Sequence, residues 1–431
     1  MPEALPTRSV RLLAAGVAVV VATSAGAIGA PAALGYTGSL DPSFSGDGLA
    51  SLSNTFVGAV ATAAGRTYVL GEYDGQTTRP ERLYRLAPDG SLDTGFGTGG
   101  FFGTSSATYW LDLSVDPQGR TLLVGQSRRS VSLVRVTAQG TRDDSFGRGG
   151  PVQIGDRHTE ALTLTRDAQG RVLVLTGQNQ GTPQRPRLDT CVTRLLPGGR
   201  PDRSFGRRGT SCVDVARSEQ PFALTVDGRD RPLVTGGGAR TSPRTWVLRL
   251  RAASGRPDRS FGSSRTGVVS VRFGSRLQSV GTAVGVSGGS ITVGVGVQSG
   301  TRPLGSGRSV RAGALRLTSS GRIDTGYGSR GRALLPSYAA AALGVSLFID
   351  TDGRAVAVGQ SNGTSPRALV GALTKDGGVD TGISPNGWAR VPGLTGDSFS
   401  VDATLGNGRL IVVGTSLRPT TFNGFVAAFV A

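Results

Sequence analysis

The residue types that most often carry out catalysis or bind metal ions are scarce in this 431-residue sequence. One histidine excludes a multi-histidine metal site, and two cysteines exclude a four-thiolate zinc site or a thiolate-held iron–sulfur cluster. His158 lies between Asp156 and Glu160 in a loop between two expected strands, where a solvated imidazole is the simpler interpretation. We therefore expect no catalytic residue, no bound metal and no cofactor.

An aspartate recurs about every 56 residues, followed by turn residues and then, in most copies, Phe-Gly. A carboxylate at the start of a turn can accept backbone N–H groups two or three residues on, and glycine permits positive φ. We expect a structural role for these residues. Calcium ligation is the alternative, but neither FIDTDG (348–353) nor SGDG (45–48) supplies the oxygen ligands of a calcium loop. The repeated residues are Asp41, Asp93, Asp143, Asp202, Asp258, Asp324 and Asp380.

An arginine precedes five of these aspartates by eight residues, or by nine in one copy, whereas the other two repeats have Ala372 and Ala428 at that position. One interpretation is a recurring arginine–aspartate pair, or hydrogen bonds to turn carbonyls between repeats. The other is a partial ring of arginines that binds an anionic ligand. Both stay open at the level of sequence. The five candidates are Arg85, Arg135, Arg194, Arg249 and Arg316.

The two cysteines, Cys191 and Cys212, lie 21 residues apart on either side of a repeated aspartate. In an exported chain a lone pair at this spacing favours a disulfide, with two free buried thiols as the alternative. A Cα separation beyond about 7 Å would exclude the bond without backbone movement.

Apolar segments keep step with the repeated aspartate and predict four strands per repeat. One is a G-R turn followed by an apolar run, as in GRTLLVG (119–125), and another is L-x-R-L, as in VTRL (192–195). A third run precedes the G-R turn and a fourth follows Phe-Gly. Seven such units predict an all-β fold, a seven-bladed β-propeller of four-stranded antiparallel blades over residues 33–431. An open β-solenoid is the alternative.

The two ends of the repeat array are incomplete in complementary ways. The last L-x-R-L copy, VAAF (426–429), has no aspartate after it, and Asp41 has no such strand before it. We therefore expect the two chain ends to complete one shared blade.

The first 32 residues have the pattern of a secretory signal peptide. Arg8 and Arg11 precede an apolar stretch, Leu12–Val21, and Ala30-Pro31-Ala32 fits the small-x-small rule, so we expect cleavage after Ala32. An uncleaved anchor over residues 12–34 is the alternative. No other segment is apolar for long enough to span a bilayer, so the mature protein is expected to be secreted or cell-surface associated.

The combined pattern L-R-L-x-x-x-G-x-x-D-x-x-F-G-x-x-G resembles the delta-60 repeat family of secreted bacterial proteins. The resemblance covers residues 39–431 and implies a propeller-like β fold and export. The family pattern assigns no catalytic residue. The copies at Phe44-Ser45, Tyr327 and Ile383-Ser384 depart from it, which points to the ends as the weakest blades or the closing seam.

Net charge is the remaining clue to function. The chain carries +18, and Lys375 is its only lysine. The basic residues are spread through all repeats, so no nucleic-acid partner is expected. We expect a monomeric, non-enzymatic extracellular or cell-surface binding module whose partner is another protein or an anionic cell-envelope polymer. The alternative is an extracellular lyase or glycan-active enzyme that uses carboxylates at the channel mouth. The loops between the G-R strand and the L-x-R-L strand vary most, so binding is expected on their rim.

Overall fold

The computed structural model describes residues 36–74, 80–103, 108–181, 188–215, 219–238, 244–274, 277–300, 310–337, 343–361, 364–418 and 421–430. The expected signal segment, residues 1–32, lies outside these ranges. Every regular element within them is a β-strand. Over the same ranges, no helix long and apolar enough to cross a membrane is found.

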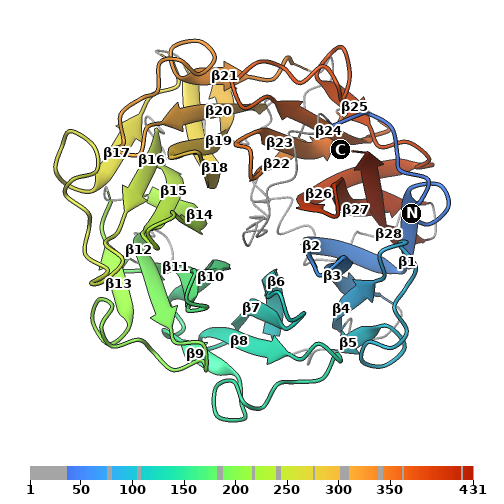
Figure 1. Ribbon diagram of the computed structural model, residues 1–431, viewed down its shortest axis with the longest axis horizontal. Helices are drawn as coiled ribbons and strands as arrows, with labels where there is room; N and C mark the ends of the chain where they lie inside the picture. Colours follow the sequence, from blue (N-terminus) through green and yellow to red (C-terminus); the bar gives the residue numbers. More distant parts are fainter. Residues whose placement is uncertain are drawn as a thin grey trace.

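Seven four-stranded antiparallel sheets form a closed ring around a central opening (Figure 1), which confirms the predicted propeller. In each blade the first strand is innermost. The blades are, in ring order: blade 1, β2 (Thr55–Ala63), β3 (Arg66–Tyr73), β4 (Glu81–Leu86) and β5 (Phe101–Gly103); blade 2, β6 (Thr108–Val115), β7 (Thr121–Ser127), β8 (Val131–Val136) and β9 (Val152–Ile154); blade 3, β10 (Thr159–Arg166), β11 (Val172–Asn179), β12 (Leu188–Leu195) and β13 (Thr210–Val213); blade 4, β14 (Glu219–Val226), β15 (Pro232–Gly238), β16 (Thr245–Arg249) and β17 (Val268–Val271); blade 5, β18 (Leu277–Ser287), β19 (Ser290–Ser299), β20 (Arg311–Leu317) and β21 (Arg332–Leu334); blade 6, β22 (Leu343–Ile349), β23 (Ala355–Gln360), β24 (Ala368–Leu373) and β25 (Trp388–Arg390); blade 7, β26 (Asp397–Gly406), β27 (Arg409–Leu417), β28 (Phe422–Val430) and β1 (Leu49–Ser53).

Both faces of each blade are covered by its neighbours, which explains why the second strands are apolar without alternation. In β7, Leu122, Leu123 and Val124 are consecutive and fully buried. Leu123 packs in a cluster with blade 1, whereas Leu122 and Val124 pack in a cluster with blade 3. A strand with two buried faces needs apolar side chains at successive positions. The G-R runs therefore reflect blade stacking.

Each innermost strand contains a register shift typical of a β-bulge. The residue that resumes the pairing after the shift is buried in all seven blades. These residues are Ala59, Asp112, Thr163, Ala223, Ala283, Ser346 and Asp402. Two of the seven blades thus place a carboxylate where others have alanine.

The chain ends share blade 7, as the incomplete end repeats predict. β1 pairs antiparallel with β28, with Leu49 opposite Ala427. The segment before β1 also follows β28, because the Thr37 N–H donates to the Val430 carbonyl and the Asp41 N–H to the Ala428 carbonyl. The outermost strand of the last blade therefore comes from the start of the ring.

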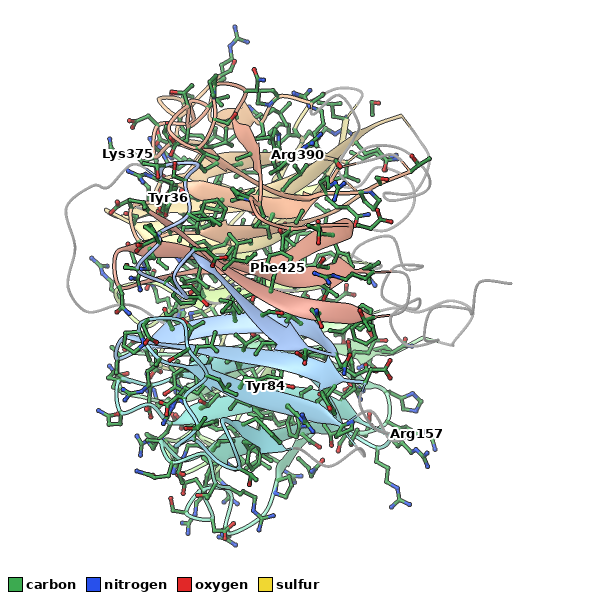
Figure 2. All side chains as sticks on the ribbon, turned by 90° about the vertical axis from the view of Figure 1, so that its right-hand side faces the viewer. Tyr36, Tyr84, Arg157, Lys375, Arg390 and Phe425 are labelled. Atoms are coloured by element: carbon green, nitrogen blue, oxygen red, sulfur yellow. A yellow bond between two sulfur atoms is a disulfide. The ribbon has the colours of Figure 1, made fainter. Side chains whose placement is uncertain are left out.

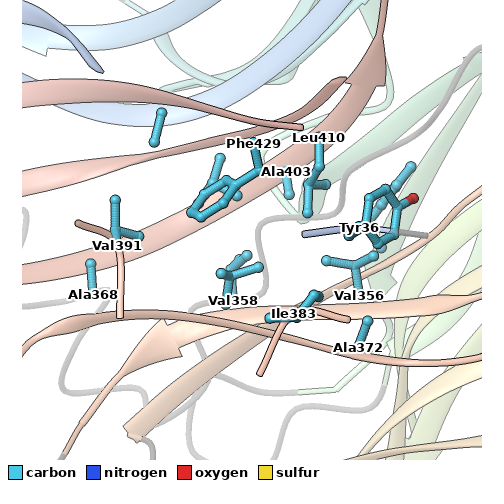
Figure 3. Close-up of a cluster of buried hydrophobic side chains, with 14 of the residues drawn as sticks. Tyr36, Val356, Val358, Ala368, Ala372, Ile383, Val391, Ala403, Leu410 and Phe429 are labelled. Carbon is cyan, nitrogen blue, oxygen red and sulfur yellow. The ribbon is translucent and has the colours of Figure 1, made fainter. Parts of the chain in front are cut away.

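Tyr36 fills the contact between blades 6 and 7, where the repeat pattern is interrupted. Blade 6 has Ala372 and Ile383 in place of the usual arginine and phenylalanine. The Tyr36 ring packs in the same buried cluster as both residues (Figure 3). Its hydroxyl donates to Asp350 at 2.6 Å, and the Arg354 guanidinium lies 5.1 Å from the ring centroid. A side chain from outside the blade thus replaces the missing pair.

The predicted disulfide is confirmed between Cys191 of β12 and Cys212 of β13. These residues are direct cross-strand partners with a Cα–Cα distance of 4.1 Å, and they are bonded. The same cross-strand position in blade 2 is held by a hydrogen bond from Ser132 to Gln153, at 3.0 Å. The disulfide therefore fixes the outermost strand of blade 3.

Replacing both cysteines with serine should preserve the fold but lower the free energy of unfolding. Closing a loop of this length stabilises a protein by about 3 kcal/mol on the chain-entropy model. Urea unfolding of the wild type and of the Cys191→Ser, Cys212→Ser double variant measures the difference. The reduced wild type is the control and should match the double variant. An unchanged free energy of unfolding would contradict a stabilising role.

Candidate functional site

The five repeated arginines each contact two blades. In each case the arginine Nε lies 2.7–2.9 Å from an Oδ2 oxygen of the repeated aspartate in the same blade. Arg194 and Arg249 are almost completely buried, with side-chain exposures of 1% and 2%. The pairs are Arg85–Asp93, Arg135–Asp143, Arg194–Asp202, Arg249–Asp258 and Arg316–Asp324.

The same guanidinium groups reach across to the next blade. Each lies 4.4–5.0 Å from the centroid of the aromatic ring that follows the aspartate. Each also donates through Nη1 to a turn carbonyl of the next blade, that of Ala138, Pro197, Ala252, Ser319 or Lys375. With a carboxylate, a carbonyl and a ring as partners, these arginines act as clamps between blades. We therefore place the candidate binding site elsewhere.

Blade 7 has the same clamp but takes its arginine from a different strand. Ala428 occupies the usual position, and Arg409 of β27 pairs instead with Asp41 at 2.6 Å. Arg409 also donates to the Pro88 carbonyl in blade 1, at 2.7 Å. The clamp across the closing seam is therefore retained.

The repeated aspartates cap the turns in which they lie. Their Oδ1 oxygens accept N–H groups two residues on, as at Ser43 (2.9 Å) and Gly382 (3.1 Å). The Ser43 hydroxyl, the Arg409 guanidinium and the Ser43 amide together lower the pKa of Asp41 to about 2. Asp380 is a turn cap whose blade has alanine in place of the arginine. None of these carboxylates belongs to a metal-binding cluster, since no group of three or more His, Cys, Asp or Glu residues suited to a metal is found among the described residues.

A second set of arginines lies exposed on the turns between the third and fourth strands of blades 2 to 5. We call this set the arginine arc. Turns 38–48, 87–100 and 374–387, at the same position in blades 7, 1 and 6, contain no arginine. The members of the arc are Arg142, Arg148, Arg200, Arg203, Arg207, Arg208, Arg251, Arg256, Arg259, Arg265, Arg322 and Arg330.

The arc is almost free of compensating negative charge. Apart from the clamp aspartates, its four turns contain one acidic residue, Asp144. Asp144 pairs with Arg142 at 2.7 Å, and both side chains are more than half exposed. Among the described residues no carboxylate pairs with the other members of the arc. A one-sided cluster of unpaired guanidinium groups creates a positive potential suited to a polyanion.

Some arginines of the arc are held in a backbone conformation that arginine disfavours. Arg208 and Arg330 have φ of 54° and 53°, and Gly99 occupies the same position in blade 1 with φ of 63°. The left-handed region costs a non-glycine residue of the order of 1 kcal/mol. Strain of this kind is often kept where the side chain has a use. The chain places arginine at a position where its own blade 1 has glycine.

The rim on which the sequence predicts binding is only partly described. Segments 182–187, 239–243 and 301–309, between the second and third strands, lie outside the described residues. The arc lies on the opposite rim of the propeller, which carries the turns between the third and fourth strands. Sequence reasoning missed it because it sought arginines at one repeated position. The available signals were the arginine after the repeated aspartate in blades 3 and 4, Arg203 and Arg259, and the absence of arginine from three turns.

Two carboxylates that do not repeat, Asp112 and Asp402, lie on innermost strands but are enclosed. Their exposures are 3% and 1%. Asp112 accepts hydrogen bonds from the Thr163 hydroxyl at 2.6 Å and the Leu164 amide at 3.2 Å, both in the next blade. Asp402 accepts one from the Val60 amide at 2.9 Å. Burial raises the pKa of Asp112 to about 7 and that of Asp402 well above its usual range.

Comparisons with known proteins agree with the propeller fold. A family model described as "Domain of unknown function (DUF5122) beta-propeller" matches residues 65–96, which span the second and third strands of blade 1 and the turn that follows. The match supports a propeller repeat family. No curated protein matches the chain significantly.

Solved structures resemble the whole ring at low identity. A polysaccharide lyase named as a PL25 ulvan lyase is 9% identical, with a TM-score of 0.54, over 88% of this chain and 95% of that one. The same enzyme type bound to a GlcA(1-4)Rha3S unit is 9% identical, with a TM-score of 0.52, over 92% and 96%. A protein of unknown function from Bacteroides caccae is 13% identical, with a TM-score of 0.37, over 63% and 80%. At such identity the lyase structures establish a shared fold alone.

Removing a clamp arginine should destabilise the protein strongly. Arg194→Ala leaves Asp202 without its partner between blades, and breaking a buried ion pair typically lowers the free energy of unfolding by about 3–5 kcal/mol. Arg203→Ala, an exposed arc residue one position after Asp202, is the control and should change it by about 0.5 kcal/mol or less. Equal changes for the two variants in urea unfolding would contradict the clamp.

Asp112 should make the protein less stable as the pH rises. Burial raises its pKa in the folded protein to about 7, well above that of an exposed aspartate, so the stabilising neutral form is lost on going from acid to neutral pH. The side chain in Asp112→Asn cannot ionise. The difference in free energy of unfolding between this variant and the wild type should therefore shift by about 2–3 kcal/mol in favour of the variant between pH 5 and pH 8. Asp144→Asn, at an exposed site, should gain nothing. A constant difference between Asp112→Asn and wild type would contradict the buried acid.

Proposed function

We propose that this protein is a secreted, non-enzymatic β-propeller that binds an anionic polymer outside the cell or at its surface. One observation carries the proposal: twelve exposed arginines are confined to four consecutive turns, with one acidic residue among them outside the clamps. Blades 6, 7 and 1 have none in the same turns.

The arrangement suits a polymer better than a small ligand. The arc extends over four blades. Guanidinium groups bind carboxylate, sulfate and phosphate through paired N–H donors. Many such contacts along a chain add up through multivalency, so individually weak pairs give useful affinity.

The expected location is consistent with this partner class. The signal-like residues 1–32 and the disulfide between Cys191 and Cys212 both favour an oxidising compartment outside the cytoplasm. An anionic polymer of the cell envelope is the partner available to a secreted or surface-associated protein. We propose that the mature chain acts as a monomer and needs no cofactor.

An extracellular lyase or other glycan-active enzyme is the competing function. It would need carboxylates at the channel mouth, whereas Asp112 and Asp402 lie enclosed between blades. Glu160, at the start of β10, is an exposed carboxylate on an innermost strand. Both functions start from polymer binding, so product formation separates them.

Charge reversal on the arc should weaken polymer binding selectively. We expect residues 33–431 to bind immobilised polygalacturonate or dextran sulfate at about 0.05 M salt and to be released at about 1 M salt. The variant Arg203→Glu, Arg207→Glu, Arg259→Glu, Arg265→Glu should bind at least about tenfold more weakly. The matched control reverses four exposed arginines outside the arc, Arg128, Arg129, Arg157 and Arg418, and should bind almost as the wild type does.

Three results would overturn the proposal. They are no binding at low salt, equal weakening in the two charge-reversed variants, and binding that is equally strong in about 1 M salt. Formation of unsaturated or new reducing ends on the polymer would show cleavage and would favour the enzymatic function over the binding function.

A further inference from the structure

A groove with a volume of about 420 Å³ follows the seam between blades 7 and 1, outside the arginine arc. We call it the seam groove. Ser51 and Ser53 of β1 line one side, and Tyr73, Arg82 and Phe101 of blade 1 line the other. Figure 2 labels Tyr84 on blade 1 and Phe425 on blade 7, the two blades that meet at this seam. Its volume lies within the range of small-ligand sites.

Blade 1 departs from the repeat at one position that lines the groove. In the third strand, the residue three before the clamp arginine is Cys191 in blade 3 and Trp246 in blade 4, and both are buried. Blade 1 has Arg82 there, and its side chain is half-buried. The closing seam is thus lined by a charged side chain where blades 3 and 4 bury an uncharged one.

The Arg82 guanidinium is held by two aromatic rings and, within the described ranges, not by a carboxylate. Its guanidinium carbon lies 3.4 Å from the centroid of the Tyr73 ring and 4.1 Å from that of the Phe101 ring. No carboxylate among the described residues pairs with it, and the adjacent Glu81 accepts the Trp110 amide at 2.6 Å. Two aromatic rings restrain the guanidinium through its π-system, which leaves its in-plane N–H groups to bind an oxyanion.

Serine hydroxyls share the rest of the groove with apolar side chains such as Leu52, Leu86 and Leu92. Ser45, Ser51, Ser53 and Ser91 are exposed along it. The Ser91 hydroxyl donates to the Asp89 carboxylate at 2.7 Å, which orients its oxygen to accept a further hydrogen bond. The groove therefore combines one cationic group, Arg82, with several serine hydroxyls. A ligand that fits it carries an acidic group that pairs with Arg82 and hydroxyl groups that bond the serines.

We infer that the seam groove binds an acidic saccharide, whose carboxylate or sulfate pairs with Arg82 and whose hydroxyls contact the serine side chains. The inference rests on the proposed function for its ligand class and adds a discrete site for a few sugar units. The arc attracts a polyanion by charge density, whereas the groove selects for an acid group on a polyol. The two sites therefore differ in the length of chain that they need.

Short oligosaccharides test the groove without engaging the arc strongly. We expect tetragalacturonate or a chondroitin sulfate tetrasaccharide to bind the mature chain by calorimetry, and neutral maltotetraose not to bind. Arg82→Gln should weaken the acidic tetrasaccharide by about tenfold, and Arg82→Lys by less, because lysine keeps the charge but not the paired donors. The arc variant with four reversed charges is the matched control and should bind the tetrasaccharide almost as the wild type does.

Ser53→Trp provides a test that leaves Arg82 in place. It fills the groove from the exposed face of β1 and should abolish tetrasaccharide binding while long-polymer binding through the arc remains. Thermal unfolding checks that each variant is folded. If long polymers bind but no acidic tetrasaccharide does, or if Arg82→Gln and Ser53→Trp both bind it normally, the groove assignment fails and the proposed function stands. If neither polymer nor tetrasaccharide binds, both fail.

Discussion

The ring depends on one composite contact, the clamp that joins neighbouring blades. Blade faces meet through apolar side chains, which attract one another without fixing an angle or a height. The clamp supplies direction: an arginine pairs with the aspartate of its own turn, lies beside an aromatic ring and donates to a carbonyl of the next blade. Beside it, the glycine after the ring donates its N–H to the next blade, as Gly206 does to Ser254 at 2.9 Å. Repeated around the circle, this contact sets each blade against the next.

This contact divides the charge of the protein into two populations with different roles. Clamp arginines such as Arg194 are buried and neutralised in place, so they add little to the field outside. Arginines such as Arg203, in the same turn, are exposed and unpaired. A net charge of +18 therefore describes neither population. What matters for recognition is that, on the turns between the third and fourth strands, exposed arginines occur only in blades 2 to 5, so one part of that rim is strongly positive and the rest is not.

The repeating features could be predicted from the sequence, and the unique ones could not. Spacing alone identified seven blades, the shared closing blade and the cross-strand disulfide, because each follows from a pattern present several times or from a lone cysteine pair. Spacing could not separate the two interpretations of Arg85, since a clamp and an exposed ring need the same periodicity. The repeat pattern could not predict that Tyr36 replaces a clamp, because Tyr36 precedes the first repeat. Asp112 and Arg82 occupy positions where most other blades have uncharged residues, and only the packed ring shows what surrounds them.

The pairing of β1 with β28 also constrains the order in which the ring can form. Leu49 meets Ala427, so the first strand of the ring finds its partner only after nearly every other strand has been delivered. A chain that leaves the cytoplasm from its N-terminus would carry β1 as an unpaired edge throughout translocation, when exposed edges are prone to join foreign strands. Ser51 and Ser53, at alternate positions of β1, keep one face of that strand polar before it pairs with β28. Ring closure is thus a late event in folding, because it needs β28, the last of the described strands.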